Sequence, residues 1–123
     1  MRIAVYASDM ERRHKLSVLI ETALLRKGEL AQVTLFPETC EMAQAAQSGA
    51  GDPFALALIE GARDENSLRA LCVRMPVILV GDKEESSTAF DVGAKYFIDA
   101  PICASRLDRA ISRCLTDGKE KAI

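Results

Sequence analysis

Four acidic residues stand where apolar segments of the sequence end. They are Asp9 after 2–7, Glu60 after 54–59, Asp82 after 77–80 and Asp99 after 96–98. If these segments are parallel strands, their carboxyl ends meet at one edge of a sheet, where such sheets bind ligands. Two or three carboxylate oxygens around a small volume can hold Mg²⁺ or Ca²⁺. Asp9, Glu60 and Asp82 are therefore candidate ligands for a divalent cation.

A second interpretation of the same carboxylates stays open. Each of them precedes a predicted helix by a few residues, and acidic side chains favour the positive end of a helix dipole. We expect no basic residue or histidine at these positions to act as a base or a phosphate clamp, and Lys83 is the nearest candidate. The only histidine, His14, has no cysteine near it in the sequence, which indicates a surface residue early in a helix.

The four cysteines do not form a metal or disulfide pattern. Cys40, Cys72, Cys103 and Cys114 are nowhere closer than 11 residues apart, so the chain has no C-x-x-C pair and no zinc-ribbon spacing. Cysteines among apolar neighbours behave as small hydrophobic residues. We expect them to be reduced and buried or half-buried.

Apolar runs and helical periodicities alternate along the chain. The predicted strands are 2–7, 31–36, 54–59, 77–80 and 96–98. The predicted helices are 9–27, 39–48, 65–73, 86–92 and 103–115. Ser8 and Glu11 have the spacing of a capping box for the first helix. The segment 49–53 reads as a turn, and Asp117 with Gly118 is expected to end the last helix.

This alternation predicts a parallel sheet covered on both faces in one domain of 123 residues. A net charge of −2 argues against direct binding to a nucleic-acid backbone. No apolar run approaches the roughly 20 residues of a membrane span, and no signal peptide is evident, so a cytoplasmic protein is expected. Glycine-rich phosphate loops and a G-x-S-x-G elbow are absent from the sequence, which disfavours an enzyme.

The order of the elements resembles the receiver (CheY-like) domain of bacterial response regulators. Residues 89–101 (AFDVGAKYFIDAP) are similar to the receiver pattern A-x-x-x-G-A-x-x-Y-[LI]-x-K-P, and the A-F-x-V-G-A form resembles LytTR-type regulators. Residues 76–80 and 2–9 are similar to the fourth and first receiver strands. The resemblance implies a flavodoxin-like (βα)5 three-layer sandwich with strand order 2-1-3-4-5. It covers residues 1–116, which leaves 117–123 as a tail or the start of a linker.

The residues that carry receiver phosphotransfer are largely replaced. The family's acidic pair aligns with Ala7 and Ser8 beside Asp9, its acceptor aspartate with Glu60, its switch hydroxyl with Gly81 and its lysine with Ala100. Mg²⁺ would lose ligands, and a transferred phosphoryl group would lose its neutralising charge. We therefore expect an atypical receiver without phosphorylation or cofactor, although Glu60 as a phosphomimic or a residual phosphoacceptor stays open.

The resemblance implies a signalling module of a two-component response regulator that acts by binding a protein partner or a second copy of itself. The expected interface residues are Phe90, Tyr96, Arg106, Arg109 and Arg113. Transcription regulation through DNA would need an output domain outside this chain. The alternative is a flavodoxin-like domain that binds a small ligand or a divalent cation.

Overall fold

The computed structural model describes residues 1–47, 54–61 and 64–121. The predicted turn at 49–53 lies outside the described residues. The described part contains the ten predicted strands and helices and one additional short 3-10 helix.

The described chain forms one sheet of five parallel strands in the order β2-β1-β3-β4-β5, as predicted. The strands are β1 (Arg2–Tyr6), β2 (Gln32–Phe36), β3 (Phe54–Glu60), β4 (Val77–Gly81) and β5 (Tyr96–Asp99). The uninterrupted apolar sequences of β3 and β4 match their place inside the sheet, because a strand covered on both faces has no solvent side.

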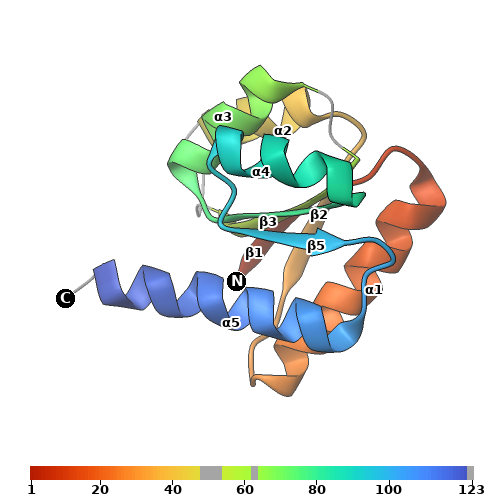
Figure 1. Cartoon of the computed structure of the whole chain (residues 1–123). Helices are drawn as coiled ribbons and strands as arrows, with labels where there is room; N and C mark the ends of the chain where they lie inside the picture. The colour runs from red at the N-terminus through yellow and green to blue at the C-terminus, as the bar shows by residue number, and fades with distance from the viewer. Residues whose placement is uncertain (48–53, 62–63, 122–123) are drawn as a thin grey trace.

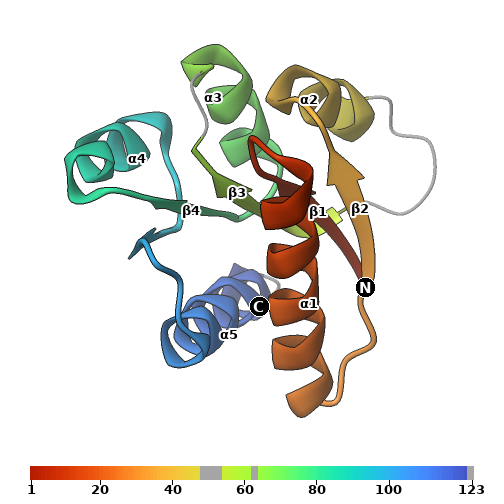
Figure 2. The same ribbon diagram turned by 90° about the vertical axis from the view of Figure 1, so that its right-hand side faces the viewer.

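Helices cover both faces of the sheet and give a three-layer sandwich (Figures 1 and 2). The helices are α1 (Met10–Arg26), α2 (Thr39–Gln47), α3 (Glu65–Arg74), the 3-10 helix η1 (Lys83–Glu85), α4 (Ser86–Val92) and α5 (Ala104–Lys121). α1 and α5 pack on one face, while α2, α3 and α4 lie on the other (Figure 1).

Alternation along the strands divides the buried side chains between two cores. In β3, Leu56 and Leu58 pack with α1 and α5, whereas Ala57 and Ile59 pack with α2, α3 and α4. This is the two-residue period of a strand whose successive side chains point to opposite faces.

The buried residues of the core under α1 and α5 are aliphatic apart from Cys114. The core under α2, α3 and α4 also holds Phe36 and Phe54, whose rings pack edge to face with their centroids 6.0 Å apart.

The cap of α1 differs from the prediction. The predicted capping residue Ser8 is exposed, and Asp9 caps the helix with its carboxylate accepting the N–H of Arg12 at 2.8 Å. The reason is the starting point of the helix. Since α1 begins at Met10, Asp9 is the last extended residue and its short side chain reaches the N–H three residues ahead.

The end of α5 also differs from the prediction. The helix does not stop at Asp117 and Gly118 but continues to Lys121. A glycine inside a helix costs only about 1 kcal/mol relative to alanine, and the lysines and glutamate after it are good helix formers. The predicted domain boundary at residue 116 therefore falls inside a helix, and the boundary itself stays a prediction.

Candidate functional site

The carboxyl edge of the sheet brings the predicted site positions together. Strand register sets Glu60 beside Val80, so Glu60 and Gly81 end neighbouring strands. Gly81 pairs in turn with Asp99, which precedes Ala100. Parallel strands thus place the ends of β3, β4 and β5 at one edge, as the sequence predicted.

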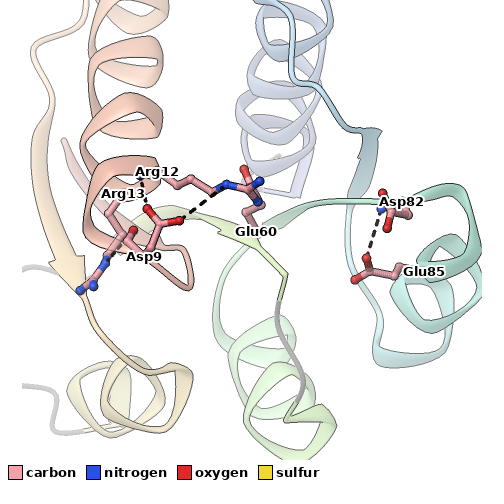
Figure 3. Close-up of polar contacts among 6 residues, drawn as sticks. All are labelled: Asp9, Arg12, Arg13, Glu60, Asp82 and Glu85. Carbon is pink, nitrogen blue, oxygen red and sulfur yellow. Dashed lines mark hydrogen bonds and ion pairs between the residues drawn. The ribbon is translucent and has the colours of Figure 1, made fainter.

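Glu60 forms a close ion pair with Arg12 at this edge. An oxygen of the Glu60 carboxylate accepts a hydrogen bond from the Arg12 guanidinium at 2.7 Å (Figure 3). The Glu60 side chain is only 15% exposed, whereas that of Arg12 is 61% exposed. The guanidinium therefore covers the carboxylate from the solvent side and neutralises its charge.

Asp9 approaches the same guanidinium. Its carboxylate lies 3.8 Å from Nε of Arg12 and also accepts the backbone N–H of that residue. Arg12 is thus the counter-ion of two of the predicted carboxylates, one from β3 and one from the start of α1. A charge-assisted contact with a guanidinium uses the same lone pairs that a metal would need.

From the sequence, Lys83 was the nearest basic candidate and Arg12 was not considered, but the structure places Arg12 at this edge. Arg12 lies in the first turn of α1, three residues after the strand-end carboxylate Asp9. The overlooked signal was this spacing. A residue three positions beyond a helix cap lies on the first turn, and a side chain as long as arginine reaches back over the cap from there.

Asp82 lies apart from this cluster and belongs to a different local structure. Its backbone N–H donates to Oε1 of Glu85 at 3.1 Å, at the start of η1 (Figure 3). Asp82 itself is exposed. Within the described residues, no group of three or more histidine, cysteine, aspartate or glutamate side chains is arranged to hold a metal ion.

The Glu85 carboxylate takes the space beside Gly81. A Cβ atom added to Gly81 would lie 2.9 Å from both Cδ and Oε1 of Glu85, closer than real side chains approach. A neighbouring carboxylate therefore occupies the space that a side chain at position 81 would take. Ala100, which follows Asp99 at the same edge, has no side-chain group that could bind an anion.

Two open hollows lie at this edge, and the ion pair lines the first of them. One, of about 350 Å³, is lined by Arg12, Lys15, Leu16, Glu60 and residues 100–102. The other, of about 530 Å³, contains Asp82, Lys83, Asp99 and Arg106 in its lining. In the second hollow, Arg106 lies 4.0 Å from Asp99. The lining of each hollow therefore contains both basic and acidic side chains, and neither hollow carries charges of one sign only.

The four cysteines differ in solvent exposure. Cys114 is buried and Cys40 and Cys72 are half-buried, as predicted, but Cys103 is exposed just before α5. Burial raises the pKa of Cys72 to about 11. A hydrogen bond to Glu38 raises the pKa of Cys40, whereas the Ser105 hydroxyl and the backbone N–H of Arg106 lower the pKa of Cys103.

The predicted interface residues lie on α4, β5 and α5. Phe90 is 79% exposed, Tyr96 is half-buried, and the three arginines of α5 (Arg106, Arg109 and Arg113) are exposed. Asp108 on the same helix turns toward α1 and pairs with Arg26 at 3.2 Å. Asp108 is thus held toward α1, whereas among the described residues none of the three arginines forms an ion pair with that helix.

Solved structures of low sequence identity share this architecture. A protein named for pilus assembly (CpaE) from Burkholderia thailandensis superposes with a TM-score of 0.75 at 20% identity, over 94% of this chain and 98% of that one. The response regulatory domain of MrkE from Klebsiella pneumoniae gives 0.76 at 14% identity, over 98% and 99%. A response regulator receiver domain protein from Clostridium thermocellum gives 0.76 at 16% identity, over 96% of each chain.

This chain has the receiver fold. The sequence matches no protein-family model and no curated protein. The likeness is therefore one of fold, and the chemistry must be argued from the residues at the carboxyl edge. In the part of the chain that the structure describes, no helix is both long and apolar enough to cross a membrane.

Proposed function

We propose that the chain is an atypical receiver module of a two-component-type regulator, which signals by protein contact without phosphorylation of its acceptor position. The observation that carries this proposal is the 2.7 Å ion pair between Arg12 and Glu60. Glu60 stands at the end of β3, where the resemblance places the phosphoacceptor. Its carboxylate is already engaged by a resident cation.

Three features of the site oppose phosphoryl transfer. A phosphoryl donor would meet the Glu60 carboxylate covered by the Arg12 guanidinium. Mg²⁺ demands near-ideal octahedral geometry, and Asp9 and Glu60 would have to leave Arg12 to provide it. Gly81 and Ala100 have no hydroxyl or ammonium group to hold the transferred phosphate, and positioning with charge stabilisation supplies most of such catalysis.

The ion pair also leaves no role for a phosphoryl donor at this edge of the sheet. A receiver that changes state needs a ligand with different interaction free energies in the two states. Here the permanent charges of Glu60 and Arg12 stand at the position where such a ligand would bind. We therefore propose that the module presents one constant surface and that its output is set by which protein it binds.

The surface of α4, β5 and α5 fits such a contact. Phe90 on α4 is an exposed aromatic ring and α5 carries three exposed arginines, and aromatic residues and arginine are enriched at the centres of protein interfaces. We propose that a protein partner or a second copy binds there. DNA would be reached only through an output domain outside this chain, in a cytoplasmic regulator.

The phosphorylation part of the proposal is tested by intact-mass measurement. The chain is incubated with acetyl phosphate and Mg²⁺, beside the matched variant Glu60→Gln, in which the acceptor carboxylate is removed. The proposal expects an unchanged mass for both proteins. A gain of one phosphoryl group by the natural chain, absent from Glu60→Gln, would overturn it and make Glu60 a working phosphoacceptor.

A further inference from the structure

The outward face of α1 carries three large apolar side chains that the fold leaves uncovered. Met10 is 65% exposed, Val18 62% and Leu25 63%. They follow one another about two helical turns apart, so they form one stripe. His14 and Glu21 lie on the same stripe and are exposed. We call these five residues the α1 stripe.

The α1 stripe is not part of the core contact of this helix. The buried residues of α1 are Leu16, Ile20, Ala23 and Leu24, which lie on the opposite side of the helix. Figure 2 shows α1 along its whole length at the outside of the molecule, with only α5 beside it on that face of the sheet. Single exposed apolar residues are ordinary on a protein surface, but an aligned stripe indicates a contact.

We propose that the α1 stripe binds the α1 stripe of a second copy of this chain, with the two helices antiparallel. A two-fold axis near Val18 sets Met10 opposite Leu25 of the second copy and brings the two Val18 side chains together. Every apolar side chain of the stripe then covers an apolar side chain. A single register satisfies all of them, as a self-complementary two-fold contact requires.

The charges on and beside the stripe favour the same register. His14 faces Glu21 of the second copy, and its ring can donate to that carboxylate. On the neighbouring flank, Glu11 faces Arg26 of the second copy. Arg26 uses one nitrogen for Asp108 of its own chain, and a guanidinium has five N–H donors, so others stay available.

The opposite orientation is disfavoured by the same residues. A parallel pair of α1 helices sets Glu11 against Glu11 and Glu21 against Glu21, and like charges in contact oppose association. Only one helix of each copy takes part in the antiparallel contact. We therefore expect a weak dimer, below the buried area of about 1,200 Å² at which stable interfaces begin.

Cysteine cross-linking tests this geometry, because a residue on a two-fold axis meets itself. Val18→Cys is made in a Cys103→Ser background, which removes the exposed native thiol. Val73→Cys on α3, at a site 87% exposed, is the matched control, and Phe90→Cys on α4 reports separately on the surface of α4, β5 and α5. After mild oxidation, disulfide-linked dimer is measured on a non-reducing gel against the Cys103→Ser parent.

We expect Val18→Cys to form dimer several-fold faster than Val73→Cys. Sedimentation at high protein concentration gives a second measurement, in which Val18→Arg weakens self-association and Val73→Arg does not. Equal cross-linking of the two cysteine variants, or a natural chain that stays monomeric at high concentration, would overturn the proposal. Neither readout involves Glu60, so the phosphorylation proposal stands or fails independently.

Discussion

The Arg12 guanidinium lies 2.7 Å from the Glu60 carboxylate, across the gap between the first turn of α1 and the end of β3. This contact joins two elements that are far apart in the sequence, at the edge of the sheet where parallel folds bind their ligands. The role we propose for the module depends on this contact more than on any other.

The ion pair itself is expected to contribute little to stability. Arg12 is largely exposed, and solvent-exposed ion pairs are worth only about 0.2–1 kcal/mol. A double-mutant cycle with Arg12→Gln and Glu60→Gln, followed by urea denaturation, should give a coupling free energy in that range. A coupling of several kcal/mol would show that the pair holds the fold together and would weaken the functional account.

Restoring a hydroxyl at the switch position should disturb Glu85. In Gly81→Ser the new Cβ meets the Glu85 carboxylate, which must rotate away and release the N–H of Asp82. We expect a loss of about 0.5–1.5 kcal/mol, the net value of one hydrogen bond.

The control for this variant is the same substitution made together with Glu85→Ala. Once the carboxylate is absent, the serine should add no further cost in chemical denaturation. An equal cost of Gly81→Ser in both backgrounds would show that Glu85 is not what occupies the position.

The cap of α3 predicts a pH-dependent stability. The Ser67 hydroxyl and backbone N–H bond the carboxylate of Asp64 and lower its pKa from the usual 3.8. A lowered carboxyl pKa gives stability that is present above pH 3.8 and is lost as the pH falls through the folded-state value.

Asp64→Ala should therefore lower the Tm at neutral pH, and its difference from the natural chain should shrink below pH 3.8. Asp64→Asn keeps an acceptor oxygen but does not titrate, so it serves as the control. A difference between the natural chain and Asp64→Ala that stays constant with pH would contradict this account of the cap.

Thiol reactivity should separate the cysteines. Cys103 is exposed and its pKa is lowered, whereas Cys114 is buried and burial raises the pKa of Cys72 to about 11. Because the thiolate is the reactive form, a thiol reagent should label Cys103 first in the folded protein, and Cys103→Ser should remove that fast phase. Fast labelling that persists in Cys103→Ser would place the reactive thiol elsewhere.

The sheet was predictable because its strands carry a strong signal. The apolar runs of β3 and β4 are too short for buried helices and end at charged or glycine residues, and alternation with helices dictates a parallel sheet. The end of α5 was not predictable from Gly118, because a glycine lowers helix stability without forbidding the helix.

The sequence predicted where the residues of the candidate site lie in the sheet, but not which side chains they contact. Strand ends located Glu60, Gly81 and Ala100 on one edge, since topology alone decides that. The ion pair of Glu60 depends on the direction in which the long Arg12 side chain extends from α1. The hydrophobic periodicity of the sequence predicts the helix but not that direction. The backbone contact of Asp82 with Glu85 was likewise not predicted, because it forms within a local turn at the start of η1.

The central claim is that Arg12 already occupies the place of a cation beside Glu60, and Mg²⁺ titration tests it most directly. Thermal unfolding is followed with increasing Mg²⁺ for the natural chain, Glu60→Gln, Arg12→Ala and the double variant Arg12→Ala with Glu60→Gln. We expect no rise in Tm for the natural chain, a rise for Arg12→Ala, whose carboxylates have lost their counter-ion, and none for the double variant. A rise in the natural chain that Glu60→Gln abolishes would contradict the claim, since Mg²⁺ would then bind Glu60 in the presence of Arg12.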